Sequence, residues 1–130
     1  MHNSNQMLGK GLVQRFIDLY NSFEIKQMID LFTDDCIFQS ISHDNETIEC
    51  HGKEELFKMA DQSAQIFSDR KQIVTNWIVD TDKIAVEIEY AAILAQDLPG
   101  GLKKGDSLKL KGISLYEFAD GKIKRLVDFS

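Results

Sequence analysis

The sequence predicts an α+β fold, in which helices pack on one face of a mostly antiparallel sheet. Apolar residues recur at steps of three and four in the first half of the chain, the period of helices, and at steps of two from residue 71, the period of strands. This order, helices first and adjacent strands last, is typical of α+β domains. The chain has 130 residues, near the usual size of one domain, so we expect a single domain over residues 1–130.

Three helices are expected before the strands. The first covers about residues 7–22, and its apolar stripe consists of Leu8, Leu12, Phe16, Leu19, Tyr20 and Phe23. A short second helix follows, for which Ser22 is a suitable N-cap. The third begins past Gly52, where two glutamates in the first turn suit the helix dipole, and its apolar positions extend to Phe67.

Strands are expected in two groups. "CIFQSI" and "IEC" are short β-prone segments separated by a polar turn over residues 42–47. The later group alternates apolar and polar residues and is interrupted by turn-forming segments. Its four strands are predicted at residues 71–79, 83–94, 106–118 and 121–130.

Composition excludes several classes of function. The formal net charge is −6, so a nucleic acid or an anionic membrane would have to bind against the overall field. No apolar run approaches the ~20 residues that span a bilayer, and the N-terminus lacks the pattern of a secretory signal, so we expect a cytoplasmic protein. Cys36 and Cys50 form no metal-binding motif with the scattered histidines, so we expect neither a metal nor another cofactor.

Several segments together resemble one family. "LVQRFIDLYNSFEIKQMIDLFTDDCIFQS", the helix start "HGKEEL", the hairpin "VDTDKIAVEIEY" and the final "F-x-x-GKI" occur in the order found in SnoaL-like proteins of the nuclear transport factor 2 superfamily. The resemblance covers nearly the whole chain. It implies a cone-shaped barrel of three N-terminal helices packed on a strongly curved, mostly antiparallel sheet. Such cones enclose an apolar pocket and often dimerise through the other face of the sheet.

The family's functional residues are present only in part. Ketosteroid isomerases have a tyrosine at the position of Phe16 and acids at the positions of Ser40 and Ser114, so their mechanism is not supported. SnoaL-like cyclases carry an aspartate in their last strand, and "LVDF" places Asp128 there. The histidine that accompanies this aspartate in the cyclases falls at Ser114. The resemblance therefore implies one half of an acid/base pair.

Two registers of the last hairpin lead to different orientations of Asp128. If Asp120-Gly121 form a two-residue turn, Ser114 pairs with Val127, and Asp128 lies on the polar face of the strand. If residues 119–121 form a three-residue loop, the register moves by one, and Ser114 and Asp128 share a face. We prefer the second register, because the resemblance implies it and because a partner subunit would cover the second apolar face.

The expected function is binding of a small apolar or carbonyl-bearing molecule. If the protein is catalytic, the chemistry is cofactor-free isomerisation, cyclisation or hydration, with Asp128 as the proton carrier. The alternative is a non-catalytic dimeric module that binds another protein and has a closed pocket. The expected ligand-binding residues are Phe16, Tyr20, Phe38, Ser40, Trp77, Tyr90, Ser114 and Tyr116. A homodimer through the sheet face is expected in either case.

Overall fold

The computed structural model describes residues 2–42, 44 and 46–130, with side chains from residue 8 onward. The predicted turn over 42–47 includes residues 43 and 45, which lie outside the described residues. The elements are α1 (His2–Asn21), α2 (Ile25–Ile29), β1 (Phe32–Ile41), β2 (Thr47–His51), α3 (Gly52–Gln65), β3 (Phe67–Val79), β4 (Lys83–Leu94), β5 (Ser107–Ala119) and β6 (Lys122–Phe129).

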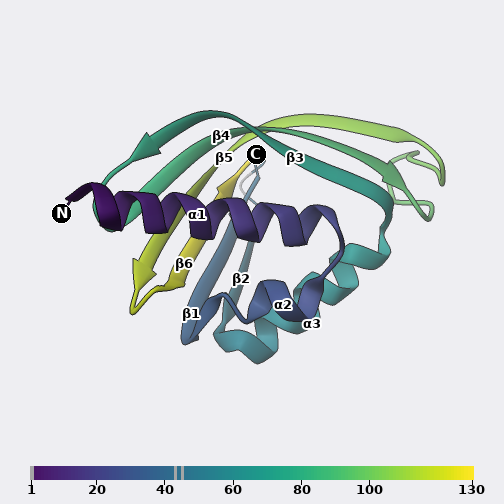
Figure 1. Cartoon of the computed structure of the whole chain (residues 1–130). Coiled ribbons are helices and arrows are strands. Elements are labelled where there is room, and N and C mark those ends of the chain that lie inside the picture. Colours follow the sequence, from purple (N-terminus) through teal and green to yellow (C-terminus); the bar gives the residue numbers. More distant parts are fainter. Residues whose placement is uncertain (1, 43, 45) are drawn as a thin grey trace.

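The strands form one curled sheet in the order β2-β1-β6-β5-β4-β3. All neighbouring strands are antiparallel except β1 and β6, which are parallel. Figure 1 shows the long strands β3, β4 and β5 arching over α1. The helices α2 and α3 lie near β1 and β2, at the other end of the sheet. The predicted α+β class is confirmed, but the sheet is not a closed barrel, because β2 and β3 are two separate edges.

The junction between the first two helices differs from the prediction. Ser22 does not cap α2; its Oγ donates to the carbonyl of Asp18 (2.9 Å) and so ends α1 instead. Phe23 then takes a positive φ of 61°, which interrupts the helical path. The residue before α2 is Glu24, and it makes no side-chain capping bond. The third helix also ends earlier than its apolar pattern predicts, because Phe67 already belongs to β3.

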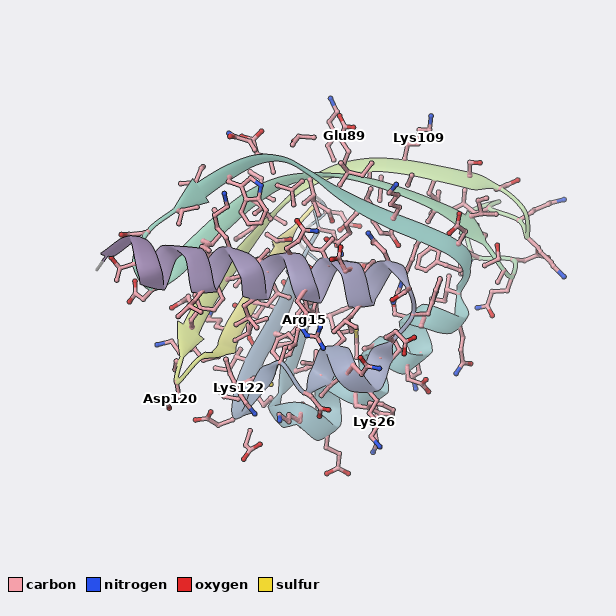
Figure 2. All side chains as sticks on the ribbon, in the orientation of Figure 1. Arg15, Lys26, Glu89, Lys109, Asp120 and Lys122 are labelled. Carbon is pink, nitrogen blue, oxygen red and sulfur yellow. The ribbon has the colours of Figure 1, made fainter. Side chains whose placement is uncertain are left out.

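The core fills the concave side of the sheet, between the sheet and the helices. Val13 and Ile17 of α1 are buried there against inward-facing residues of β4 and β6, such as Ile84 and Leu126. Charged side chains are mostly on the outside. Figure 2 shows Glu89 pointing away from the convex face, and it is exposed. Burial of this apolar set stabilises the fold at roughly 25 cal/mol for each Å² removed from water.

Gly112 allows two strands to approach closely where β5 curves. A Cβ atom at this position would lie 2.7 Å from the carbonyl oxygen of Phe129 on β6. This distance is shorter than a carbon and an oxygen tolerate without bonding, so any side chain would push β5 and β6 apart. Ser114 lies two residues along β5, and Asp128 precedes Phe129 on β6. The glycine therefore sets the strand spacing beside these two residues.

The last hairpin combines parts of both predicted registers. Asp120 and Gly121 have φ angles of 55° and 74° and form a two-residue turn, with Ala119 paired to Lys122. The predicted three-residue loop is therefore wrong. The register still moves by one, because Phe118 pairs with Ile123 whereas Glu117 pairs with Arg125.

Lys124 is the extra residue of a β-bulge. One residue of β6 has no partner between the two pairs, and Lys124 occupies this position with its side chain exposed. Beyond the bulge, Ser114 pairs with Asp128 and Tyr116 pairs with Leu126. The prediction that Ser114 and Asp128 share a face is therefore correct, but a β-bulge produces this arrangement rather than a three-residue loop.

Candidate functional site

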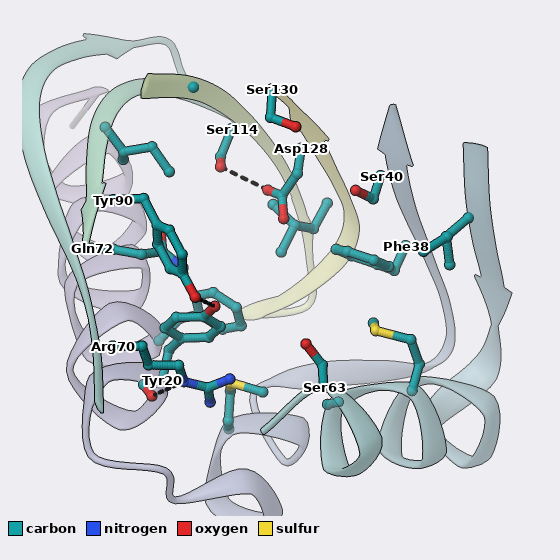
Figure 3. Close-up of a pocket in the computed structure, with 18 of the residues that line it drawn as sticks. Tyr20, Phe38, Ser40, Ser63, Arg70, Gln72, Tyr90, Ser114, Asp128 and Ser130 are labelled. Carbon is teal, nitrogen blue, oxygen red and sulfur yellow. Dashed lines mark hydrogen bonds between the residues drawn. The ribbon is translucent and has the colours of Figure 1, made fainter. Parts of the chain in front are cut away.

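A largely apolar cavity of about 300 Å³ lies between the concave side of the sheet and the helices. Its size is at the lower end of small-molecule pockets. Aromatic and aliphatic side chains make up most of the wall, including Phe16, Phe32, Phe38, Met59 and Ile88. Figure 3 shows that the polar groups extend from separate elements toward the same space.

Asp128 contributes a carboxylate to this apolar wall. Its Oδ1 accepts a hydrogen bond from the Ser114 hydroxyl at 2.7 Å, and Figure 3 shows both groups at the upper end of the cavity. Among the described residues, no Lys, Arg or His forms an ion pair with it. Asp128 keeps some accessible surface because it faces the cavity, but it is deep enough in the protein to lose most of its hydration.

Burial raises the pKa of Asp128 to about 6, and the hydrogen bond from Ser114 opposes this rise only in part. A carboxyl group with such a pKa exchanges its proton close to neutral pH. It can therefore accept a proton as the carboxylate and return it as the acid. A surface aspartate, which has a pKa of ~3.9, is a much weaker base.

Two tyrosines form a second polar group in the wall. The hydroxyl oxygens of Tyr20 on α1 and Tyr90 on β4 are 3.1 Å apart and share a hydrogen bond. Burial raises the pKa of both phenols, so both remain protonated near neutral pH. Because the two groups carry two protons and one hydrogen bond uses one of them, the other proton is free to be donated to a ligand oxygen.

Arg70 is a buried cation in the same cavity. It is 2% exposed and comes from the start of β3. Its Nε donates to the backbone carbonyl of Tyr20 at 3.0 Å, at the C-terminal end of α1. Its guanidinium carbon lies 3.7 Å from the centre of the Tyr20 ring and 4.5 Å from that of Phe23. Among the described residues no carboxylate pairs with it.

The structure brings most of the expected site residues to the cavity. Those that line it are Phe16, Tyr20, Phe38, Ser40, Tyr90, Ser114 and Asp128. Trp77 does not line it; its ring lies 5.0 Å from the Nζ of Lys10, so it packs against α1 instead. Tyr116 does not line it either, because it is 1% exposed and packs edge-on against Phe16 within the core.

Sequence analysis missed Arg70, Gln72 and Ser63, all of which line the cavity. Arg70 lies in the polar run "SDRKQ", just before the residue at which the strand pattern becomes clear. In the structure β3 begins at Phe67, so Arg70, Gln72 and Val74 are alternate residues that face inward. An earlier start of the strand would have placed Arg70 on its inward face. Gln72 was already within the predicted strand and Ser63 within the predicted third helix, but neither was recognised as a cavity residue.

Comparison with known proteins identifies the family. The SnoaL-like domain profile matches residues 13–126, and the chain belongs to the SnoaL-like family. No curated protein matches the chain in sequence. Among the described residues, no helix is long and apolar enough to cross a membrane, and no cluster of three or more His, Cys, Asp or Glu side chains is arranged to hold a metal ion.

Solved structures share the fold at low sequence identity. A candidate polyketide cyclase from Xanthomonas campestris is 14% identical with a TM-score of 0.79, and the match covers 97% of this chain and 92% of that one. A phenazine biosynthesis-related protein from Pseudomonas aeruginosa is 21% identical with a TM-score of 0.79, covering 98% and 82%. An epoxide hydrolase from M. tuberculosis is 11% identical with a TM-score of 0.76, covering 95% and 83%. At these identities the similarity establishes the fold alone.

Proposed function

We propose that this protein binds a small, largely apolar molecule with a carbonyl group and that Asp128 transfers a proton to and from it. The observation that carries the proposal is the buried carboxylate, which faces an apolar cavity and, within the described part of the chain, has one side-chain hydrogen bond, from Ser114. An unpaired buried carboxylate costs the fold stability, and catalytic sites are where such groups are commonly found.

The chemistry is proton transfer next to a carbonyl. The Asp128 carboxylate removes a proton from the carbon beside the carbonyl, and the electron pair of that C–H bond moves onto the carbonyl oxygen as an enolate. A proton from the tyrosine pair stabilises the oxygen by hydrogen bonding. The neutral Asp128 then returns its proton to the same carbon or to another one. Return of the proton to another carbon gives isomerisation. In a cyclisation the enolate carbon instead attacks a second carbonyl of the same molecule, and Asp128 gives its proton to the oxygen of that carbonyl. Both sequences balance without a cofactor.

The cavity supports binding over the closed-pocket alternative. A volume of about 300 Å³ is several times the ~30 Å³ that one water molecule occupies in the liquid. A module that used only its outer surface would gain stability by filling this space with larger side chains.

Deuterium exchange tests the proposed role of Asp128. β-Tetralone is a small apolar ketone, and its acidic hydrogens exchange in heavy water at a rate that proton NMR follows. We expect the wild-type protein to accelerate exchange above the buffer rate and Asp128→Asn to abolish the acceleration. Glu89→Gln, which removes an exposed acid from the convex face, is the matched control and should behave as wild type. Equal rates for wild type and Asp128→Asn would refute the catalytic proposal.

We further propose that the protein forms a homodimer through the convex face of the sheet. Ile78, Ala85, Leu115 and Val127 form one register row across β3, β4, β5 and β6 on this face. Ile113 and Phe129 pair in the next row and are 47% and 42% exposed. Val127 itself is buried, but Ile78, Ile113 and Phe129 give this face an exposed apolar patch of the kind that is typical of an interface.

A further inference from the structure

Arg70 is the strongest indication of ligand chemistry that the proposed reaction does not use. A buried cation is costly unless an anion or a full set of hydrogen bonds compensates it. The Nη2 atom of Arg70 is buried and has no hydrogen-bond partner among the described residues. The Oε1 atom of Gln72, two residues further on the same face of β3, is also buried and unpartnered there. Unsatisfied polar atoms in a pocket are those that a ligand can satisfy.

The stacking around Arg70 leaves the edge of the guanidinium free. Tyr20 and Phe23 contact it through their ring faces, which compensate part of the charge but accept none of its in-plane hydrogen bonds. Among the residues that the structure describes, only Nε has a hydrogen-bond partner, the carbonyl of Tyr20. Figure 3 shows the guanidinium pointing into the cavity on the side of Ser63. This planar edge matches a carboxylate, which can accept two parallel hydrogen bonds from it.

The position of Arg70 is fixed before any ligand binds. Gln72 donates its backbone N–H to the side chain of Asn21 at 2.8 Å, and Asn21 donates back to the carbonyl of Gln72 at 3.1 Å. These bonds attach β3 to the end of α1 beside Arg70. A prearranged donor loses little side-chain entropy when it binds an anion.

Arg70 and Asp128 lie at separate ends of the pocket, with Tyr20 between them. Neither residue is an ion-pair partner of the other. The pKa of Tyr20 is raised, mainly because the phenol is buried. The charge of Arg70 opposes this rise and the charge of Asp128 adds to it, so both charges act on this phenol. Figure 3 shows the same order, from Asp128 through the tyrosines to Arg70.

We propose that the ligand is a small keto acid, whose carboxylate binds Arg70 and whose carbonyl lies at the tyrosines, with the adjacent C–H toward Asp128. The inference rests on the proposed function and narrows its substrate class. A carboxylate carries a single negative charge and would neutralise the single positive charge of Arg70. A phosphate dianion would leave an unpaired negative charge in an apolar cavity, which is unfavourable.

Paired acids and esters test this inference on the wild-type protein. The probes are benzoyl-propionate, benzoyl-butyrate and benzoyl-pentanoate, which differ in the distance between ketone and carboxylate, and the methyl ester of each. Calorimetry should show that the best acid binds at least about tenfold more tightly than its ester, because only the acid compensates Arg70. Equal affinities, or tighter binding of the ester, would overturn the inference.

Two variants assign the preference to a residue. Arg70→Met removes the charge and keeps the bulk of the side chain, so acids and esters should bind it equally well. Lys71→Met is the matched control, because Lys71 is the next residue on β3 and is exposed, and it should keep the preference. A preference that survives Arg70→Met, or that is lost in Lys111→Met at the cavity wall, would overturn the assignment to Arg70.

A spectroscopic measurement covers the case in which Arg70→Met does not fold. The chain has three arginines, Arg15, Arg70 and Arg125, so nitrogen NMR can resolve their side-chain signals. The acid should shift the Arg70 signal and its ester should not, and an unshifted signal with bound acid would contradict the inference. If neither acids nor esters bind but β-tetralone exchange is accelerated, this inference fails and the proposed function stands; if exchange is not accelerated either, both fail. If both bind equally and β-tetralone exchanges, only this inference fails.

Discussion

At the scale of single residues, the burial of Asp128 lowers the stability of the protein near neutral pH, while it raises the pKa of the carboxyl group to the range that the proposed proton transfer needs. Folding moves its carboxyl group from water, where the pKa is ~3.9, to a site where burial raises the pKa to about 6. The folded state therefore holds this proton more tightly than the unfolded state. The resulting contribution to stability is complete below about pH 4 and is lost as the pH rises through about 6.

Asp128→Asn should remove this pH dependence. We expect the free energy of unfolding of the variant, relative to wild type, to increase by about 2–3 kcal/mol between about pH 4 and about pH 8, since one pKa unit corresponds to about 1.4 kcal/mol. Urea unfolding at several pH values measures the difference, with Glu89→Gln as the control for the loss of one negative charge. A difference that is constant with pH would show that Asp128 is not buried in the way described.

At the scale of secondary structure elements, Gly112 holds β5 against β6, and its replacement should be costly. In Gly112→Ala the new Cβ meets the Phe129 carbonyl, which belongs to the backbone and cannot rotate away. We expect a loss of roughly 1–3 kcal/mol, the usual cost of overpacking. Gly11→Ala is the opposite case: it lies in α1 with nothing within 4 Å of the new Cβ, and it should stabilise by roughly 0.5–1 kcal/mol. Thermal denaturation of both variants tests the contrast, and a neutral Gly112→Ala would contradict it.

The elements themselves were predictable from the sequence, whereas their registers and partners were not. The helical and strand periods located α1, α3 and β4 because those patterns are local. The bulge at Lys124 has no local signature, since the flanking residues fit either register, and the resemblance to the family supplied the correct face. Arg70 was missed for a related reason: whether a polar residue in a polar run is buried depends on α1, which is distant in sequence.

At the scale of the whole molecule, the convex face should bring two copies together. Sedimentation at tens of micromolar should show a dimer for the wild type and a monomer for Ile113→Lys, because the lysine places a charge within the apolar surface. Leu8→Lys is the control, because Leu8 is 73% exposed on α1, away from this face. A wild-type protein that remains monomeric, or an Ile113→Lys variant that remains dimeric, would refute an interface at this site.

The bulge at Lys124 links the inside of the protein to its outside. Side chains alternate along β6, so deleting Lys124 would exchange the two faces of everything that follows it. Asp128 and Leu126 would turn toward the convex face of the sheet, while Val127 and Phe129 would turn toward the cavity. Deleting this one residue would thus disrupt the cavity and the proposed dimer interface at the same time, although no residue of either surface had changed. The number of residues between the last turn and Asp128 therefore decides which side chains face the cavity, as much as the identity of those residues does.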